Sequence, residues 1–358
     1  MNPENTTPSN ILTRFSFLDI CRGIAAMAVV FSHALENSFP ESRNFTDNIV
    51  NFGQIGIVAF FLISGFIIPY TLERSKNIKD YVIRRFARIY PLYFSAFILG
   101  TFLFAAGHWN GDSVDSHIST LFLLSHLSFT QEYIKNINNV VPGSWTLFLE
   151  IIWYILAAFI FYFFKNRKLP IYSALILQLI LSFISIAIQV RFPLGRTGLL
   201  ICCIVGYATY LNSTQIISLS EFKKIICMAF FTLAISIYVS FGIYHIGTPF
   251  SWHGVLLSWA TAFLLFFSLW STQKTTSIFH KIFSWLGEIS YSLYLVHGFV
   301  IFFLKSMGLS EMNLFISIFP LSIILGWFTW RIIELPGMEA GRKISKSITT
   351  QVPKSIPR

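Results

Sequence analysis

Charged side chains are scarce in this chain, and their scarcity excludes an ordinary water-soluble domain. Only 12% of the 358 residues are Asp, Glu, Lys or Arg, whereas 54% are hydrophobic. Soluble domains carry roughly 25% charged residues. A chain this apolar cannot bury all of its hydrophobic surface in one aqueous core, so lipid must cover part of that surface. We therefore predict an all-α, polytopic transmembrane helical bundle whose first partner is the lipid bilayer.

Signatures of disulfides, metal sites and nucleic-acid binding are also missing. The four cysteines form no CxxC pair, and we interpret them as buried apolar thiols. They are Cys21, Cys202, Cys203 and Cys227. His108, His117 and His126 show no metal-ligand spacing, so we predict no metal. The net charge of +10 comes from basic residues in short loops between apolar runs, which argues against a nucleic-acid partner.

Ten apolar runs approach the length of about 20 residues that a membrane-spanning helix needs. They lie near residues 17–36, 52–72, 90–107, 145–164, 170–190, 196–211, 224–244, 253–270, 285–304 and 313–333. The runs 90–107 and 196–211 are marginal, and Ile118–Thr130 is too short to cross, so we expect it to be interfacial or re-entrant. The first run contains Asp19 and Arg22 and lacks a small-residue cleavage site, so we expect no cleaved signal peptide.

The distribution of basic residues among the connections predicts an orientation. With ten spans and a cytoplasmic N-terminus, nineteen of the 26 Lys and Arg residues fall in cytoplasmic segments. Only five fall on the other side, namely Arg43, Lys135, Arg191, Arg196 and Lys305. Because cytoplasmic loops are enriched in Lys and Arg, both termini are predicted to be cytoplasmic. We divide the chain into a mobile cytoplasmic N-terminus at 1–16, a transmembrane domain at 17–335 and a basic cytoplasmic tail at 336–358.

Several ionisable residues lie within or at the edges of the apolar runs. A charged side chain at mid-membrane costs about 2.5–3.5 kcal/mol on insertion scales, and such residues usually face the bundle interior and serve a function. The candidates are Asp19, Arg22, His33, Glu150, Glu288, His297, Arg331 and Glu334. We interpret them as marks of a buried chemical site.

The first apolar run places an arginine and a histidine on one helix face. Arg22 and His33 are 11 residues apart, which is within about 20° of three full turns and about 16 Å along the axis. Asp19 precedes Arg22 by three residues and can pair with it. The alternative is a structural ion pair with a buried, hydrogen-bonded histidine. We favour a functional site because a glutamate, Glu150, also lies inside an apolar run.

Two further segments carry candidate site residues. Arg85 and Arg88 share a helix face and suit a clamp for the phosphates of a cytoplasmic donor, although topology-setting charge alone is the alternative. Ser64 interrupts the second apolar run beside Gly65. Its hydroxyl is expected to line the site or to act as a nucleophile with His33, unless this segment only packs closely.

The remaining candidates belong to the fourth and ninth runs. Glu150 follows Trp145 in an otherwise apolar helix and is expected to orient His33 or an acceptor hydroxyl. Tyr291 and His297 belong to a polar stripe. This stripe hydrogen-bonds a sugar, lines a passage or joins helices, and these alternatives stay open.

Together these segments resemble the acyltransferase-3 family, membrane-bound O-acyltransferases that modify bacterial polysaccharides, peptidoglycan, Nod factors and some macrolides. The motifs stand in order over roughly residues 15–335: LDICRGIAA with His33, GQIGIVAFFLISGF, RRFARIYPLY, SWTLFLEIIWY, LGEISYSLYLVH and RIIELP. The resemblance implies a multi-pass enzyme of the bacterial inner membrane. It further implies acyl-CoA, most often acetyl-CoA, as donor and a carbohydrate or glycolipid as acceptor. It implies no permanently bound cofactor and allows a homo-oligomer.

The resemblance also implies roles for individual residues. Arg22 and His33 match the family's separated arginine and histidine. Arg85 and Arg88 match its paired arginines, which would hold the CoA phosphates while the pantetheine arm runs past Arg22. Glu150 matches its membrane glutamate. His33 would act as a general base on the acceptor hydroxyl or carry the acyl group transiently. Tyr291 is a candidate donor to the oxyanion.

Two other classes of protein fit parts of the same pattern. A secondary transporter also has about ten helices with buried charges, but we find neither inverted repeats nor paired broken helices in the sequence. An acyl carrier would pass its group to a separate extracytoplasmic transferase. Some relatives carry a fused extracytoplasmic esterase-like domain, and we expect none in this chain.

Overall fold

The computed structural model describes residues 15–107, 118–272 and 278–350, and within these ranges it contains helices and no strand. Most of the N-terminus expected to be mobile, 1–16, lies outside the described residues. The end of the predicted tail and the histidines His108 and His117 also lie outside them. The helices are α1 (Ser16–Ser38), α2 (Ser42–Asn48), α3 (Phe52–Arg74), α4 (Ile78–Ala105), α5 (Thr120–Leu127), η1 (Gln131–Tyr133), α6 (Trp145–Phe163), α7 (Leu169–Ala187), α8 (Leu194–Ser213), α9 (Leu219–Ile237), η2 (Tyr238–Ile243), α10 (Trp252–Ser271), α11 (Ile278–Glu288), α12 (Ser290–Ser306), α13 (Glu311–Thr329), η3 (Trp330–Glu334) and α14 (Leu335–Thr350).

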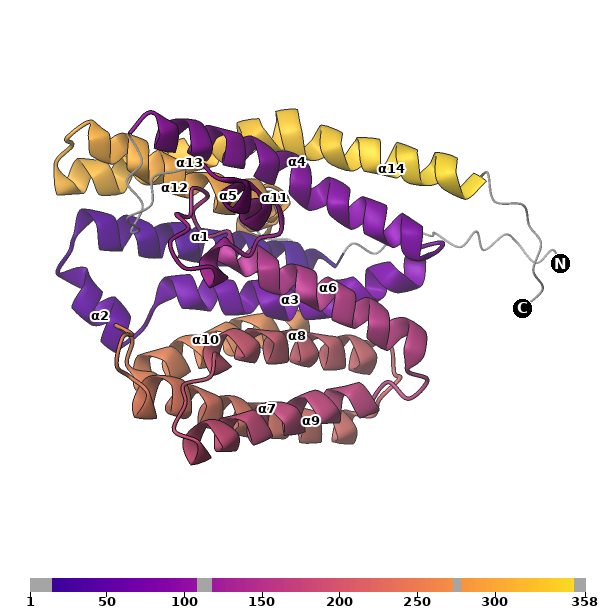
Figure 1. Cartoon of the computed structure of the whole chain (residues 1–358). Helices are drawn as coiled ribbons and strands as arrows, with labels where there is room; N and C mark the ends of the chain where they lie inside the picture. Colours follow the sequence, from indigo (N-terminus) through magenta and orange to yellow (C-terminus); the bar gives the residue numbers. More distant parts are fainter. Residues whose placement is uncertain (1–14, 108–117, 273–277, 351–358) are drawn as a thin grey trace.

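The membrane-spanning helices run side by side along one common direction (Figure 1). In the described part of the chain, nine helices are long and apolar enough to cross a membrane, or ten if the bent pair of α11 and α12 counts as one span. This confirms the predicted all-α bundle of about ten spans. The start of α1 and the end of α14 lie toward the same end of the bundle (Figure 1), which we call the terminal end. That the terminal end faces the cytoplasm stays a prediction from the charge distribution.

The span expected at 285–304 is not one straight helix. The chain bends by 73° between α11 and α12, so that α11 crosses the bundle beside α1. Glycines permit this contact, because a Cβ on Gly287 would lie 1.9 Å from the carbonyl oxygen of Asp19. A Cβ on Gly23 would lie 2.0 Å from the carbonyl oxygen of Phe283. Neither the hydropathy of this run nor a proline within it signalled the bend, which accompanies the packing of α11 against α1.

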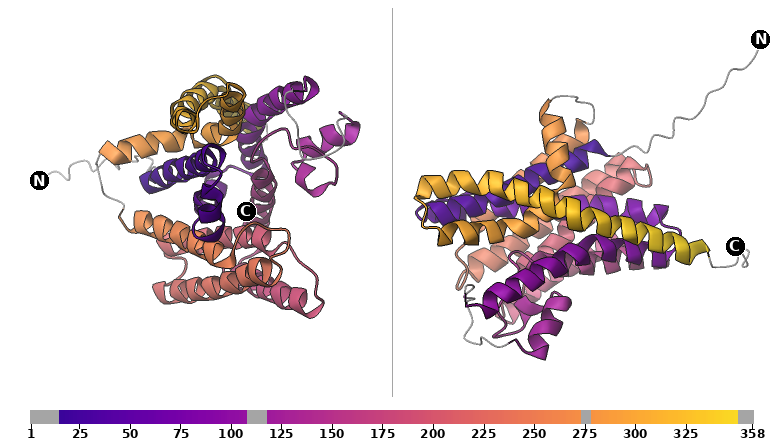
Figure 2. Two further views of the ribbon diagram at one scale, coloured as in Figure 1. Left: turned by 90° about the vertical axis from the view of Figure 1, so that its left-hand side faces the viewer. Right: turned by 90° about the horizontal axis from the view of Figure 1, so that it is seen from above.

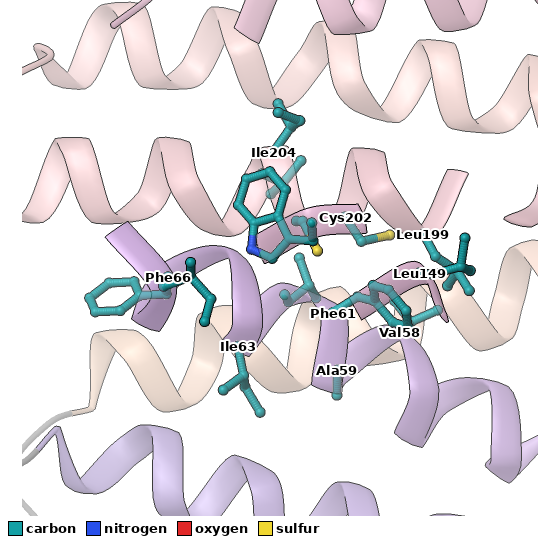
Figure 3. Packing of buried hydrophobic residues seen from close by; sticks show 14 of the residues in the cluster. Val58, Ala59, Phe61, Ile63, Phe66, Leu149, Leu199, Cys202 and Ile204 are labelled. Atoms are coloured by element: carbon teal, nitrogen blue, oxygen red, sulfur yellow. The ribbon is translucent and has the colours of Figure 1, made fainter. Parts of the chain in front are cut away.

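The core is built around α3, which packs closely against α8 and also contacts α1, α6 and α10 (Figure 3). Gly65 and Gly206 allow the two backbones to touch, since a Cβ on either would lie 2.0 Å from a carbonyl oxygen of the other helix. Cys202 and Cys203 lie in this contact, and all four cysteines are free. Cys21, Cys202 and Cys203 are buried, but Cys227 on α9 is exposed, so the prediction of a buried thiol was wrong there.

The chain after the last apolar run continues as helix. A π-helical turn, η3, joins α13 to α14, and α14 packs along α4 (Figure 2). Ser345 of α14 donates a hydrogen bond to the buried carboxylate of Asp80 at the start of α4. Part of the segment predicted as a basic tail is thus a helix held against the bundle.

The short run Ile118–Thr130 contains only the eight-residue helix α5, as its length predicted. His126 of α5 is fully buried, and its Nδ1 donates to the carbonyl oxygen of Phe122 at 2.9 Å. Its Nε2 accepts from the backbone N–H of Val140 at 3.5 Å. Burial lowers the pKa of His126 and so favours its neutral ring. The two hydrogen bonds of this ring connect α5 to the segment before α6.

Candidate active site

A narrow cavity of about 90 Å³, the inner pocket, lies between α1, α3, α4, α6 and α12. Its walls carry most of the polar residues that the sequence singled out: Arg22, Ser64, Arg85, Arg88, Glu150 and Tyr291. These residues come from five helices that are distant in the sequence. The structure therefore brings the three predicted arginines together around one space.

The three arginines differ in how their charge is balanced. Arg22 pairs with Asp19 at 3.2 Å, as the three-residue spacing predicted. Arg88 lies 3.6 Å from Glu334. Arg85 donates to the hydroxyl of Thr71 at 2.6 Å and forms no ion pair within the described residues. Arg85 is therefore the guanidinium of this pocket that has most capacity left for an anion.

Glu334 is a buried counter-ion whose partner the sequence did not indicate. It has no exposed surface, and it accepts a hydrogen bond from the hydroxyl of Ser292 at 2.7 Å. The π-helical turn η3 carries Glu334 to α4, where Arg88 balances its charge. A buried carboxylate without such partners would be strongly destabilising. Arg331 of the same turn is exposed instead, so it does not belong to the inner pocket.

Glu150 lies in the inner pocket and not beside His33. Its carboxylate accepts a hydrogen bond from the hydroxyl of Tyr154, one helical turn further along α6. It makes no contact with His33 in the described part of the chain, so the expectation that Glu150 orients the imidazole is wrong. Tyr291 is engaged as well, because its hydroxyl donates to the carbonyl oxygen of Ile89 at 2.9 Å.

His33 lies toward the other end of α1 and has a different carboxylate partner, Glu36. The Nδ1 of His33 is 3.7 Å from a carboxylate oxygen of Glu36. Glu36 also accepts from the hydroxyl of Ser32 at 2.7 Å and from the side-chain amide of Asn51 at 3.5 Å. These bonds fix the carboxylate, and an imidazole beside a fixed carboxylate is suited to general-base chemistry. The three-residue spacing of His33 and Glu36 was visible in the sequence, and our sequence analysis did not use it.

His297 of α12 stacks on His33, with ring centroids 5.4 Å apart and ring planes inclined by 20°. The Nδ1 of His297 is 2.6 Å from the carbonyl oxygen of Tyr294. Since a carbonyl oxygen can only accept, Nδ1 carries the proton, and in the neutral ring Nε2 is then an acceptor. The structure thus joins His297 to His33, a contact between helices that are far apart in the sequence.

Two wide cavities meet at His33. The first, the aromatic chamber, has a volume of about 710 Å³ and lies between α1, α3, α8, α10 and η2. The second, the lateral chamber, has a volume of about 870 Å³ and lies between α1, α4 and α12. His33 and Trp145, which are both candidates from the sequence, line both chambers.

The chambers are joined to the inner pocket by shared wall residues. Ile57 lines all three cavities, and Tyr294 lines both the inner pocket and the lateral chamber. Arg22 and His33, which share a face of α1, therefore open onto cavities that adjoin each other. The arrangement is a narrow, cationic pocket that adjoins two broad chambers, both lined by His33.

The fold and these cavities define a class of protein: an integral membrane protein with polar and charged residues gathered around cavities among its helices. The acyltransferase domain family matches residues 15–331, and the chain belongs to this family. This confirms the resemblance carried by the sequence motifs. No solved structure matches the chain.

Similar proteins include an O-acetyl transferase of Shigella phage Sf6, 33% identical over 42% of this chain and 47% of that protein. Acyltransferase MdmB of Streptomyces mycarofaciens is 28% identical over 45% of this chain and 42% of its own length. Nodulation protein 10 of Rhizobium leguminosarum bv. viciae is 33% identical over 26% of this chain and 25% of its own length. Each match thus spans less than half of the relative.

Proposed function

We propose that this protein is a membrane O-acyltransferase that moves an acyl group, in the first instance acetyl, from acyl-CoA to a hydroxyl of a carbohydrate. One observation carries the proposal. His33, held by Glu36, lines two wide chambers that adjoin a narrow arginine-lined pocket at Ile57. A donor with an anionic end and a slender reactive arm fits the narrow pocket, and a bulky hydroxylic acceptor fits the chambers.

The donor side of the proposal rests on Arg85 and the size of the inner pocket. The inner pocket is much smaller than either chamber, so it suits a slender chain better than a bulky group. The pantetheine arm of CoA would therefore occupy the pocket, while its phosphates stay near Arg85, toward the terminal end. Because Arg22 and Arg88 already have carboxylate partners, Arg85 is the residue best placed to form a new charge-assisted bond.

The reaction itself would be an ordinary acyl transfer. His33 accepts the proton of the acceptor hydroxyl as the oxygen attacks the thioester carbonyl. The carbon–sulfur bond breaks, and the CoA thiolate leaves and takes up the proton. In the variant of this mechanism with a covalent step, His33 first accepts the acyl group and then passes it to the hydroxyl. The enzyme would lie in the bacterial cytoplasmic membrane with the donor on the cytoplasmic side.

The proposal is tested with purified protein in lipid nanodiscs, acetyl-CoA labelled in its acetyl group, and a pool of bacterial envelope oligosaccharides. We expect free CoA and labelled glycan to appear in equal amounts. Label that stays on the protein without a labelled glycan would identify an acyl carrier instead. Uptake of labelled compound into protein-loaded vesicles without CoA release would identify a transporter, and either result would overturn the proposed activity.

Glu36 is expected to act as a positioning residue for His33. Glu36→Gln removes the charge that holds the imidazole and should lower kcat about tenfold to a hundredfold, because a hydrogen bond to a charged group contributes about 1.5–3 kcal/mol. The KM for acetyl-CoA should stay within about twofold, since Glu36 does not line the inner pocket. Steady-state kinetics of CoA release measure both quantities. Equal loss through kcat and KM, or through the amount of folded protein, would contradict this role.

A further inference from the structure

The few basic residues at the end of the bundle opposite the terminal end are concentrated at the site. Of the 26 Lys and Arg residues in the chain, five lie in the segments at that end, and the structure describes all five. Three of them line the chambers that meet at His33: Arg191 and Arg196 the aromatic chamber, and Lys305 the lateral chamber. The other two, Arg43 and Lys135, line neither.

The two arginines of the aromatic chamber have no close carboxylate partner among the described residues. Among the described residues, Glu36 is the only carboxylate in the chamber walls, and it lies beside His33. Arg191 donates to the carbonyl oxygen of Ile246 at 3.1 Å and forms no ion pair within the described residues. Arg196 has a distant contact of 3.9 Å with Glu132. Two guanidinium groups in the aromatic chamber thus retain capacity for an anionic ligand.

The wall of the same chamber also contains a buried hydroxyl, that of Ser240, without a hydrogen-bond partner among the described residues. Ser240 is only 4% exposed. It belongs to η2, the π-helical end of α9, which also brings Phe241 into the wall. Single π-helical turns inside helices occur often at functional sites, and a buried hydroxyl without a partner is costly unless a ligand or water satisfies it.

Aromatic rings form much of the remaining surface. Trp145, Phe241 and Trp259 line the chamber, and the guanidinium of Arg196 lies 5.8 Å from the ring of Trp145. Pockets of this kind hold a ligand on apolar faces and orient it with a few polar groups. The flat apolar faces of sugar rings are suited to such a surface, and the arginines select for negative charge.

We infer that the aromatic chamber binds an acceptor that carries an anionic group close to the acylated sugar, held by Arg191 and Arg196. This inference rests on the proposed function and names the acceptor class for the same site. Two sources supply the required chemistry: the carboxylate of an acidic sugar, and the diphosphate of a lipid-linked oligosaccharide. Both place a negative charge within reach of the two guanidinium groups.

The test measures binding without a donor, so that it does not depend on turnover. The purified protein in nanodiscs of zwitterionic lipid is titrated with fluorescent trigalacturonate and with the carboxyl-reduced form of the same trisaccharide. A second arm compares a polyprenyl diphosphate disaccharide with the corresponding neutral polyprenyl glycoside. We expect the anionic member of at least one pair to bind about tenfold more tightly, as expected for one charge-assisted contact. The arm that shows the preference identifies the source of the charge.

Variants of the chain then locate the preference. Replacing both arginines, Arg191→Gln with Arg196→Gln, should remove the preference while binding of the neutral probe changes by less than about twofold. Lys135→Gln is the matched control, because Lys135 is an exposed cation at the same end that lines neither chamber. Its preference should equal that of the unmodified protein.

Three results would overturn the inference: no anionic preference in either arm, a preference that survives in the double variant, or an equal loss in Lys135→Gln. Failure of the proposed function is recognised separately, because it appears as absence of CoA release in the labelled-donor experiment. A transporter of anionic glycans, for example, would show the binding preference without releasing CoA.

Discussion

Replacement of His33 by alanine is expected to reduce CoA release and glycan labelling by at least about a hundredfold, which is the lower limit for losing a general base. In the part of the chain that the structure describes, the imidazole is the one titratable group that lines both chambers and lies beside a fixed carboxylate. Its side chain is 46% exposed, so its removal leaves the packed core intact. The KM for acetyl-CoA should change little, because the donor arginines are on the other side of the shared wall at Ile57.

His253→Ala provides a matched control for this experiment. His253 is exposed at the start of α10, at the same end of the bundle, and lines neither chamber. The rate of acyl transfer by this variant should equal that of the unmodified protein. Product formation at the normal rate by folded His33→Ala would refute the role of His33 in both versions of the mechanism. A rapid burst of covalent label in the unmodified protein, absent from His33→Ala, would favour the acyl-histidine step.

Replacement of Arg85 by glutamine is expected to raise the KM for acetyl-CoA about tenfold to a hundredfold, since a hydrogen bond to a charged group contributes about 1.5–3 kcal/mol. Arg85 has a hydroxyl partner, Thr71, and lies over the ring of Tyr154 at 5.3 Å, but it forms no ion pair with any described residue. Its charge is therefore available to a phosphate. The value of kcat at saturating donor should fall much less, because Arg85 does not line the chambers that hold His33.

Lys79→Gln is the control for Arg85→Gln, because Lys79 is an exposed cation near the start of the same helix and lines none of the cavities. A similar rise of KM in Lys79→Gln would show that a diffuse positive surface attracts the donor, and not a specific contact. An unchanged KM in Arg85→Gln would remove the inner pocket from the donor path. If Lys79→Gln does raise the KM, increasing the salt concentration should reduce that rise more than the rise in Arg85→Gln, because exposed charges are screened more strongly.

Much of the architecture followed from the sequence. Hydropathy located the spans, because each helix must satisfy its own backbone in lipid and so leaves a continuous apolar run. The same logic made the intramembrane charges stand out, among them Arg22 and His33, which the structure places in the walls of adjoining cavities. The pairing of Arg22 with Asp19 was also predictable, because it depends only on helical spacing.

Other features depended on how the helices pack. The bend at α11 exists because α11 lies against α1, and the pairing of Arg88 with Glu334 joins residues 246 positions apart. The position of Glu150 in the sequence also could not show whether its side chain would reach His33 or the inner pocket. Side-chain partners on different helices depend on rotations and close approaches that hydropathy does not record, such as the contact at Gly287.

The sequence by itself therefore showed that this protein is embedded in a lipid bilayer, that it has about ten spans, and which polar residues must avoid contact with lipid. Only the tertiary structure decided which of those residues meet, that His33 lies between two chambers with Glu36 and His297, and that Arg191 and Arg196 share one of those chambers. The physical reason is that burial in lipid is a property of each helix, whereas a site is made from contacts between helices.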